Sequence, residues 1–415
     1  MRIVICGAGQ VGFGIAEKLA QEENDVSVID TSARLVNIIR DTLDVRGVVG
    51  YGSHPDVLAQ AGAEDADMLI AVTQADEVNM VACQVAHTLF NVPTKIARIR
   101  AQSYLQPHYQ DLFARDHLPI DVIISPEIEV GGTVLQRLSL PGAVETVMFA
   151  DGSVFVVGIL CSEDCPVIDT PLRQLTELFP DLGAVVTGVF RNGRLFVPQS
   201  DDTIVVGDLV YVVAKLDQVR RTLGIFGHDE PEAKRVVIAG GGHIGAYVAR
   251  ELERRKPNVK VKIIEQSRAR AVEIADELRR TVILHGSSLD QEILLEADIQ
   301  DADVLVAVTN DDQANIIAGV MAKTLGCKRN LSLINNASYP AFAHALGIDA
   351  YVNPRAVTIS RVLRHVRRGR IRSVHSLQNG AAEVIEAEAL ETSSLVGKPL
   401  RDLNLPEGIR IGAIY

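Results

Sequence analysis

The feature that most constrains the fold of this 415-residue chain is an internal repeat. Residues 3–19 and 236–252 share a short apolar run, three glycines spaced G-x-G-x-x-G and an amphipathic stretch. Residues 67–79 and 303–315 match one another in the same order along the chain. A similarity that recurs over this length indicates one structural unit present twice, and it has to be explained before any shorter motif.

Each copy has the pattern of an α/β domain. Apolar runs of four to six residues, such as 3–6 and 26–29, alternate with amphipathic stretches of 10–15 residues, such as 12–21. This alternation predicts βαβ units and therefore a Rossmann-like, doubly wound parallel sheet with helices on both faces. Pro126 and Pro354 each open an expected crossover helix, because the fixed φ of proline and its missing N–H are tolerated in the first helical turn.

A smaller α+β lobe is expected after each copy. The chain there changes to short alternating runs separated by Asp-Gly and Asn-Gly, the strongest short-range signal of a β-hairpin. The expected elements are two hairpins, a helix and a last strand, at residues 144–160, 184–198, 171–178 and 209–214. The second lobe begins alike, with a strand at 384–391 and a helix at 399–403, and residues 408–415 align with 183–190. We therefore expect this last lobe to be incomplete at its C-terminus or completed by a partner.

Composition limits the class of protein. With 47% hydrophobic and 23% charged residues, the chain is typical of a soluble globular protein. No apolar stretch approaches the roughly 18 residues needed to cross a bilayer, and the N-terminus predicts a strand and not a signal peptide, so a cytoplasmic protein is expected. A net charge of −12 disfavours nucleic-acid binding. The five cysteines lack the spacing of a zinc site and are expected to be reduced, buried thiols.

Four segments are expected along the chain. They are a Rossmann-like nucleotide-binding lobe at 1–124, a crossover helix and small lobe at 125–226, a second nucleotide-binding lobe at 233–352, and a second crossover helix and small lobe at 353–415. The polar stretch before residue 233 serves as the linker between the two halves.

The glycine motifs predict two nucleotide sites. In the first, Gly7 permits a tight turn, Gly9 lets a diphosphate approach backbone N–H groups, and Gly12 lets helix and strand pack closely. Asp30 ends the next strand, where a carboxylate binds ribose hydroxyls. The candidate contacts of the first site are Gly7, Ala8, Gly9, Gln10, Val11, Gly12, Asp30, Thr73, Gln74, Arg98 and Arg100. Those of the second site are Gly240, Gly241, Gly242, His243, Ile244, Gly245, Glu265, Thr309 and Asn310.

The charged residues near these motifs restrict the class of nucleotide that can bind. A carboxylate at Asp30 or Glu265 repels a 2′-phosphate, which favours NAD(H) or an adenine nucleotide such as ATP or ADP over NADP(H). Arg98 and Arg100 alternate along an expected strand at 95–100, which places both on one face within reach of phosphate oxygens. The second copy has Leu333 and Asn335 instead, so the two sites are expected to differ in anion preference.

The pair of threonines and a basic segment near the second crossover helix can each be interpreted in two ways. Thr73 and Thr309 follow the fourth strand, at the edge where ligands of such sheets collect, but threonine there also caps the following helix. The basic run at 361–372 is either a solvated helix face or a contact for phosphate or an acidic partner.

The sequence favours a regulator over an enzyme. Hydride-transfer enzymes need a proton donor near the nicotinamide, yet residues 141–227 contain no histidine and one lysine, Lys215. Neither half shows a Ser/His/Asp, Cys/His or metal constellation. A bound nucleotide that only favours one conformation needs no catalytic group. An NAD-dependent oxidoreductase remains the alternative.

The ordered set of motifs resembles one family. Residues 7–12, Asp30, 52–55, 71–73 and 96–100, followed by a hairpin lobe and then the whole again, are similar to the TrkA family of peripheral regulatory subunits of bacterial Trk potassium-uptake systems. Its members consist of two RCK (regulator of potassium conductance) domains, and the resemblance covers essentially the whole chain.

The resemblance implies a function and partners. It implies a protein on the cytoplasmic face of the inner membrane that binds NAD(H) and ATP or ADP and gates the potassium-translocating subunit TrkH. It also implies pairing through the crossover helices near 126–138 and 354–367, and a tetrameric ring. A regulator of a different potassium channel or antiporter remains open. Gly52-Ser53 and Gly286-Ser287 depart from the Gly-Asp common in RCK domains, which removes a contact on the adenine side.

Overall fold

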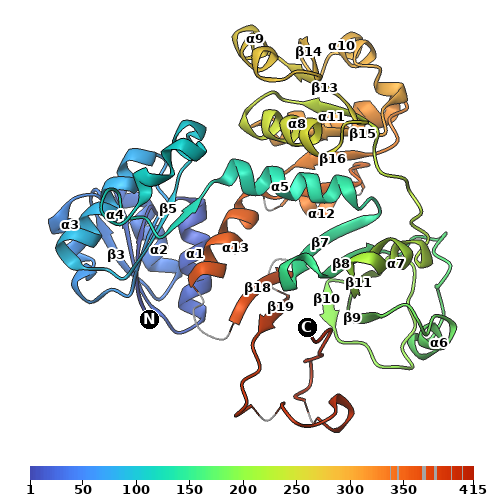
Figure 1. Ribbon diagram of the computed structural model, residues 1–415, viewed down its shortest axis with the longest axis horizontal. Helices are drawn as coiled ribbons and strands as arrows, with labels where there is room; N and C mark the ends of the chain where they lie inside the picture. The colour runs from blue at the N-terminus through green and yellow to red at the C-terminus, as the bar shows by residue number, and fades with distance from the viewer. Residues whose placement is uncertain (337, 344, 367–370, 378–380, 394, 404) are drawn as a thin grey trace. The chain divides into compact units, whose positions relative to one another are not determined.

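The computed structural model comprises two compact units (Figure 1). The units are not consecutive in sequence, because the second crossover helix belongs to the first unit. Unit 1 contains Met1–Val130 and the segment that begins at Asn353, and unit 2 contains Gly131–Val352 and the C-terminal segment. The structure describes residues 1–336, 338–343, 345–366, 371–377, 381–393, 395–403 and 405–415.

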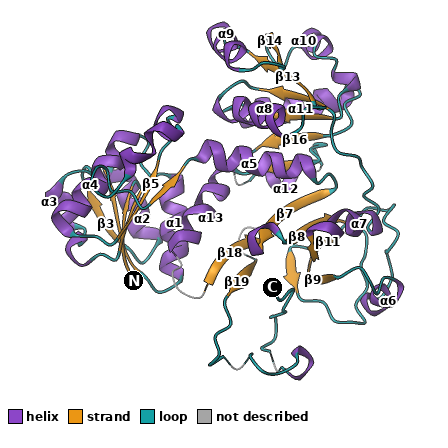
Figure 2. Cartoon of the chain, viewed as in Figure 1, coloured by secondary structure: helices purple, strands orange, loops and turns teal. Residues whose placement is uncertain are grey.

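The first N-lobe, in unit 1, is a parallel sheet with helices on both faces, as predicted (Figure 2). The strand order is β3-β2-β1-β4-β5-β6, so the order reverses between β1 and β4, where open α/β sheets bind their ligands. Its strands are β1 (Arg2–Cys6), β2 (Asp25–Asp30), β3 (Arg46–Val49), β4 (Met68–Ala71), β5 (Thr94–Arg98) and β6 (Val122–Ile124). Its helices are α1 (Gln10–Gln21), α2 (Ala33–Thr42), α3 (Pro55–Gln60) and α4 (Asp76–Phe90), with 3-10 turns at Ala63–Asp65, Gln102–Leu105 and Pro107–Phe113.

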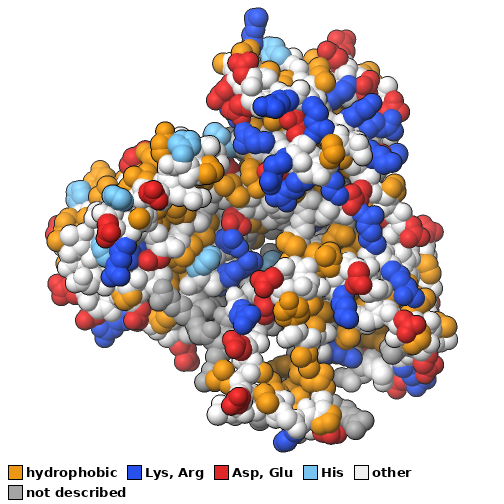
Figure 3. All heavy atoms as spheres, viewed as in Figure 1, with side chains coloured by type: hydrophobic (Ala, Val, Ile, Leu, Met, Phe, Trp, Pro, Cys, Tyr) orange, Lys and Arg blue, Asp and Glu red, His pale blue; other side chains and the backbone are white. Residues whose placement is uncertain are grey.

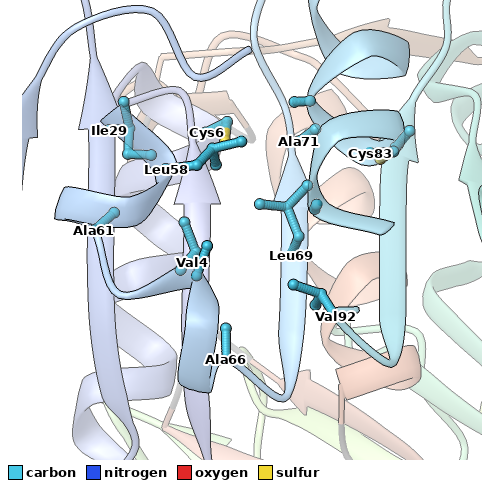
Figure 4. Packing of buried hydrophobic residues seen from close by; sticks show 14 of the residues in the cluster. Val4, Cys6, Ile29, Leu58, Ala61, Ala66, Leu69, Ala71, Cys83 and Val92 are labelled. Carbon is cyan, nitrogen blue, oxygen red and sulfur yellow. The ribbon is translucent and has the colours of Figure 1, made fainter. Parts of the chain in front are cut away.

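Two apolar layers hold this sheet. On one face α3 and α4 cover β1 and β4, and Figure 4 shows Leu58 and Cys83 facing the strand side chains Cys6 and Leu69. All the cysteines are free and buried, as expected from their spacing; they are Cys6, Cys83, Cys161, Cys165 and Cys327. Burial raises the pKa of Cys6 to about 12, so this thiol packs as an apolar group at neutral pH.

The other face is covered partly by a helix from the second half of the chain. The crossover helix α13 (Pro354–Val366) packs on α1, and Val362, Leu363 and Val366 join the core formed by β1, α1 and α2. A Cβ built on Gly14 of α1 would lie 2.4 Å from Cδ1 of Ile359, so the two helices approach closely at this glycine. The first crossover helix, α5 (Pro126–Ser139), runs from unit 1 into unit 2, where a Cβ on Gly131 would lie 2.3 Å from the Tyr247 ring.

The first C-lobe, in unit 2, is an antiparallel sheet in the order β10-β9-β11-β8-β7. Its strands are β7 (Ala143–Phe149), β8 (Val154–Leu160), β9 (Ala184–Arg191), β10 (Arg194–Phe196) and β11 (Leu209–Lys215), and its helices are α6 (Leu172–Leu178) and α7 (Val219–Ile225). The hairpins, helix and last strand lie where the turn signals predicted them. Buried Asp208, which directly precedes β11, accepts two hydrogen bonds of 2.7 Å from the guanidinium of Arg191 at the end of β9.

The second N-lobe, also in unit 2, repeats the first. Its strand order β14-β13-β12-β15-β16-β17 corresponds strand by strand to the first sheet. The strands are β12 (Arg235–Ala239), β13 (Lys260–Glu265), β14 (Val282–His285), β15 (Val304–Ala307), β16 (Asn330–Leu333) and β17 (Ala350–Val352). The helices are α8 (His243–Arg255), α9 (Arg268–Glu277), α10 (Gln291–Glu296), α11 (Asp312–Thr324) and α12 (Pro340–Ala343). The repeat in sequence is therefore a repeat in topology.

The remaining segment is less regular than predicted. The strand expected at 384–391 is β19 (Ala382–Ala387), which pairs with β18 (Ile371–Leu377), and the helix expected at 399–403 is only a 3-10 turn at Leu400–Asp402. Residues 408–415 form no strand, and they contact the first C-lobe through the Arg410 guanidinium, which donates to the Pro198 carbonyl at 2.7 Å, and through Gly412 beside Val213. Leu377 nevertheless packs into the first C-lobe core.

Basic side chains gather over α8 in the second N-lobe (Figure 3). Most are matched by carboxylates, as in the pairs of Arg250 with Glu277 at 2.5 Å and of Arg255 with Glu251 at 2.6 Å. The basic run expected at 361–372 lies partly outside the described residues. At its start, Arg361 pairs with Glu129 at 2.9 Å, so this cation contacts protein and not only solvent. Within the described part of the chain, no helix is long and apolar enough to span a bilayer.

Asp303, which precedes β15, gives the second N-lobe a dependence on pH. Burial raises the pKa of Asp303, but hydrogen bonds outweigh this: the Lys328 ammonium donates at 2.9 Å, and the N–H groups of Lys234 and Arg235 donate at 2.8 and 2.9 Å. Together they lower its pKa to about 2. Because this value is below that of an unfolded aspartate, the stabilisation is complete above about pH 4 and is lost as pH falls toward 2.

Replacing Asp303 with asparagine is expected to lower the free energy of unfolding of this lobe by about 2 kcal/mol at pH 7. The penalty relative to wild type shrinks as pH falls from 4 toward 2, where the wild-type carboxyl also takes up a proton. Urea unfolding curves followed by circular dichroism between pH 3 and 7 measure this. Asp301→Asn is the control, since Asp301 is largely exposed and pairs only at 3.8 Å with Arg235. A penalty that is constant with pH would contradict the assignment.

Candidate nucleotide-binding sites

The first glycine loop joins β1 to α1 at the point where the strand order reverses. Gly7 has φ +113°, a conformation that L side chains rarely adopt. Gly9, at φ −65°, precedes the first turn of α1, and a Cβ built on it meets nothing within 4 Å. A Cβ on Gly12 would lie 1.8 Å from the Gly7 carbonyl oxygen. Gly7 and Gly12 are thus required by the backbone, whereas Gly9 leaves open space in front of the helix N-terminus.

The second glycine loop, between β12 and α8, has the same geometry. Gly240 has φ +107°, and a Cβ on Gly245 would lie 2.0 Å from the Gly240 carbonyl oxygen. Gly242, at φ −64°, again faces open space. The free N–H groups of a helix N-terminus carry a partial positive charge and bind phosphate. Both loops therefore leave room for an anionic group beside the backbone.

An acidic side chain holds each loop from the neighbouring strand. At the end of β2, Asp30 Oδ2 accepts from the Ala8 N–H at 2.7 Å and Oδ1 accepts from the Ser32 N–H at 2.8 Å. At the end of β13, Glu265 accepts from Gly241 and Ser267 N–H groups, both at 2.7 Å. Each carboxylate oxygen retains a lone pair for another donor. The two acids thus order the loop and place negative charge beside it.

A buried asparagine, which the sequence analysis did not single out, fixes the opposite wall. Asn79 Oδ1 accepts from the Thr73 N–H at 2.9 Å and from its hydroxyl at 2.7 Å. Its Nδ2 donates to the carbonyl oxygens of Thr73 at 3.2 Å and of Arg98 at 2.9 Å. Thr73 N in turn lies 3.1 Å from the position of a Gly7 Cβ. Asn79 therefore ties β4, β5 and the glycine loop together.

The second copy repeats this clamp. Asn315 Oδ1 accepts from the Thr309 N–H at 2.9 Å and from its hydroxyl at 2.7 Å, and Nδ2 donates to the Leu333 carbonyl at 3.0 Å. Both asparagines are fully buried. The signal was present in the sequence, since each asparagine lies six residues after its threonine in the matched segments. Both threonine hydroxyls contact the asparagine and a backbone carbonyl, and the Thr309 hydroxyl also accepts the N–H of Asp311, the N-cap residue of α11, at 3.2 Å.

A charged cluster adjoins the first clamp. Arg98 Nη2 donates to the Thr73 carbonyl at 2.7 Å, while its buried Nε has no partner among the described residues. Burial, and then the like charge of Arg100, lower the pKa of Arg98, against the opposite pull of Glu127 and Asp76. Arg100 Nε contacts Glu127 Oε1 at 3.0 Å. Two arginines and two carboxylates thus meet at this edge of the sheet.

The strand expected at residues 95–100 is β5 (Thr94–Arg98), so Arg98 is its last residue and Arg100 lies just beyond it. The Ile99 N–H still donates to the Ile124 carbonyl at 3.0 Å, and the Arg100 N–H donates to the carboxylate of Asp76 at 2.9 Å and not to a neighbouring strand. In the second copy, Asp312 accepts from the Asn335 N–H and side chain at 2.9 and 3.0 Å. Leu333 is buried there, so the second copy places no cation at the position of Arg98.

The other predicted contacts lie around the two loops. Gln10 and His243 are exposed at the helix starts, and Gln74 and Asn310 are exposed after the two threonines. Ala8 and Gly241 are buried, while Val11 and Ile244 are half-buried in the first helical turns. The two sets are thus brought together, each within one unit. Among the described residues, no group of three or more His, Cys, Asp or Glu side chains is placed to hold a metal ion.

Comparisons with known proteins agree with this architecture. The TrkA-N domain family matches residues 3–126 and 236–354, and the TrkA-C domain family matches 156–227. Among solved structures, the GsuK RCK domain superposes with a TM-score of 0.62 at 20% identity, covering 88% of this chain and 76% of that one. The GsuK channel bound to NAD superposes with a TM-score of 0.61 at 19% identity, covering 88% and 63%. This likeness confirms the predicted fold.

Relatives with higher identity span the whole chain. The Trk system potassium uptake protein TrkA of Azorhizobium caulinodans is 64% identical, and the proteins of the same name from Halomonas elongata and Vibrio alginolyticus are 44% and 41% identical. Each alignment covers 100% of this chain and 90% of the relative. With two TrkA-N matches, a TrkA-C match and this identity over its full length, the chain belongs to the TrkA family of Trk system potassium uptake proteins.

Proposed function

We propose that the chain is a nucleotide-sensing regulatory subunit of a bacterial potassium-uptake system, which binds NAD(H) and ATP or ADP at its two glycine loops. Family membership supports the role in potassium uptake. Nucleotide binding is supported most directly by the open space in front of Gly9 and Gly242. Both glycines lie at helix N-termini, which are flanked by the carboxylates of Asp30 and Glu265. Two solved GsuK structures of the same fold carry NAD and ADP, and we extend this ligand class to the chain.

The proposed action is regulation by binding. The polar side chains at the carboxyl edge of the first sheet, Asn79 and Asp76, hold backbone groups of the loops around them. A ligand that meets such a framework changes the relative stability of conformations by its different affinity for each. We therefore propose that nucleotide occupancy, and not a chemical reaction, is the output of both sites.

The proposed partner is the potassium-translocating membrane subunit of the system, a TrkH-like protein. The chain would act on it at the cytoplasmic face of the inner membrane, as a peripheral protein in a tetrameric ring. The family name supports the system to which the chain belongs. The packing of α13, a helix from the second half of the chain, on α1 of the first N-lobe supports a role of the crossover helices in assembly.

Calorimetric titration of NADH, NAD, ADP and ATP into the chain tests the nucleotide sites. Asp30→Ala is expected to weaken binding at the first site, and Glu265→Ala at the second, by roughly ten- to hundredfold, because each loses charged hydrogen bonds of about 1.5–3 kcal/mol to ribose hydroxyls. Asp25→Ala, at the opposite end of β2, is the control for a lost carboxylate. Unchanged affinity for all four nucleotides in both variants would refute the site assignment.

A further inference from the structure

Glu127 is a buried carboxylate with one oxygen engaged. It is the second residue of α5, its side chain is 6% exposed, and Oε1 contacts Arg100 Nε at 3.0 Å. Its Oε2 is buried and has no hydrogen-bond partner among the described residues. Asp76 Oδ1 and Arg98 Nε, which belong to the same charged cluster, are buried without partners in the same way. Buried polar atoms left unpaired are costly, so a cluster of three suggests that its charges have a second arrangement.

Arg100 is the member of this cluster that can move. Its side chain is 53% exposed and contacts Glu127 alone among the described residues, whereas Arg98 is anchored on the Thr73 carbonyl. The cluster adjoins the glycine loop through Thr73, whose N lies 3.1 Å from the position of a Gly7 Cβ. An anionic ligand in this loop would attract the guanidinium of Arg100, since a guanidinium binds phosphate as well as carboxylate.

The second copy lacks both arginines and the glutamate of this arrangement. Leu333 and Asn335 replace the two arginines, and Arg355 replaces Glu127. Asn335 is held by Asp312, and the start of α13 is capped by Asn353, whose Oδ1 accepts the Arg355 and Ala356 N–H groups at 3.0 Å. Any link between nucleotide and crossover helix that depends on this ion pair is therefore confined to the first half.

We propose that Arg100 and Glu127 form a relay in which the diphosphate of a nucleotide in the first site draws Arg100 away from Glu127 and thereby loosens the start of α5. Glu127 is a positioning residue that competes with the ligand for one guanidinium. This inference rests on the proposed function, because it requires a nucleotide at the first glycine loop. Its consequence is specific to α5, the helix that carries the chain from unit 1 into unit 2.

Competition predicts a gain of affinity on removal of Glu127. In the full chain, Glu127→Gln is expected to tighten ADP binding at the first site three- to tenfold, since Arg100 no longer has to leave a carboxylate. In the Arg100→Gln background the same substitution should change ADP affinity by less than twofold. A carboxylate that merely repelled phosphate would give the same gain in both backgrounds, which would overturn the relay. Calorimetry at low salt, with Gly242→Ala to silence the second site, measures the cycle.

The control variant is Glu129→Gln. Glu129 lies in the same helical turn and pairs with Arg361, so this substitution removes a like charge from α5 without touching the relay, and ADP affinity should stay within twofold of wild type. If wild type and this control bind no nucleotide, the proposed function fails. If both bind, and Asp30→Ala weakens them, but Glu127→Gln changes nothing, only the relay fails.

A second test measures hydrogen exchange in the Arg100→Gln variant, whose substituted side chain is exposed and not part of the core. Hydrogen exchange at residues 126–139 should accelerate on saturation of the wild-type chain with ADP, because the ion pair at the helix start is lost. In Arg100→Gln, exchange there should already be fast, and ADP should leave it unchanged even at saturating concentration. This variant remains informative if Glu127→Gln fails to fold. An ADP response of α5 that is equal in wild type and Arg100→Gln would overturn the proposal.

Discussion

Two alanine substitutions three residues apart are expected to have different effects: Gly12→Ala should unfold the first N-lobe, and Gly9→Ala should abolish its nucleotide binding. A Cβ at position 12 would lie 1.8 Å from a backbone carbonyl oxygen, and neither the helix nor the turn can yield without losing its own hydrogen bonds. We expect a loss of about 3 kcal/mol or more in the free energy of unfolding, at the upper end for overpacking.

At Gly9 the backbone is already in a conformation that alanine adopts, with φ −65° and ψ −178°, and the new methyl group enters open space. Replacing glycine before the first helical turn should cost at most about 1 kcal/mol. The methyl group instead occupies the position where a diphosphate approaches the N–H groups, so affinity should fall by more than about a hundredfold.

Thermal unfolding and calorimetry on the same preparations separate these effects. Gly242→Ala and Gly245→Ala form the matched pair in the second N-lobe, where the geometry is the same to within a few tenths of an ångström. Gly9→Ala should leave the second site at wild-type affinity. Full nucleotide binding in Gly9→Ala, or wild-type stability in Gly12→Ala, would contradict the roles assigned to these glycines.

Asn79→Ala is the second substitution with a large expected effect. It removes four hydrogen bonds at a fully buried position and leaves the Thr73 N–H and the Arg98 carbonyl without partners. Each buried group left unsatisfied costs about 1–3 kcal/mol, so we expect about 3–5 kcal/mol in total. Thr73 would also lose its fixed place beside Gly7, and nucleotide affinity at the first site should fall with it.

Hydrogen exchange provides an internal reference for this variant. Peptides from residues 68–75 should exchange much faster in Asn79→Ala, while peptides from 304–311, held by Asn315, should keep the wild-type rate. Asn315→Ala should reverse the pattern. Asn37→Ala is the control, since Asn37 is exposed on α2 and has no role in the clamp. Equal protection of residues 68–75 in Asn79→Ala and wild type would show that the clamp contributes little.

The sequence was sufficient to predict the parallel sheets, the hairpin lobe and the glycine loops, because these depend on local patterns. Gly7, Gly12 and the apolar run before them encode strand, turn and helix within a few residues. Asn79 was missed although its signal was local. Its spacing from Thr73 recurs in the second copy, but a buried asparagine is recognised as a clamp only once its partners are known.

Features that depend on distant residues could not be predicted. The contact of Ile359 with Gly14 joins opposite ends of the chain, and nothing in either segment indicates which helix covers which sheet. The sequence predicts a strand that continues to Arg100, but the strand ends at Arg98 and the Arg100 N–H donates to the carboxylate of Asp76, which is distant in sequence. Residues 408–415 align with 183–190, most of which are in β9, but they form no strand in the structure, so the alignment carries the sequence and not the strand.

The crossover helix α13 packs on α1, the helix that directly follows the first glycine loop. Gly14, which accommodates Ile359, is two residues beyond Gly12 in the same helix, and Val362 and Leu363 lie in the core beneath it. Because packed cores change between discrete arrangements and do not deform continuously, any shift of the α1 N-terminus would require α13 to repack.

The most direct test of the account is rubidium uptake into vesicles that contain the potassium-translocating subunit, with this chain added outside in the presence or absence of NADH and ADP. The account predicts that nucleotides change the uptake rate with the wild-type chain and have no effect with the folded Gly9→Ala/Gly242→Ala variant. An equal nucleotide response with this double variant would contradict the claim that occupancy of the glycine loops regulates transport.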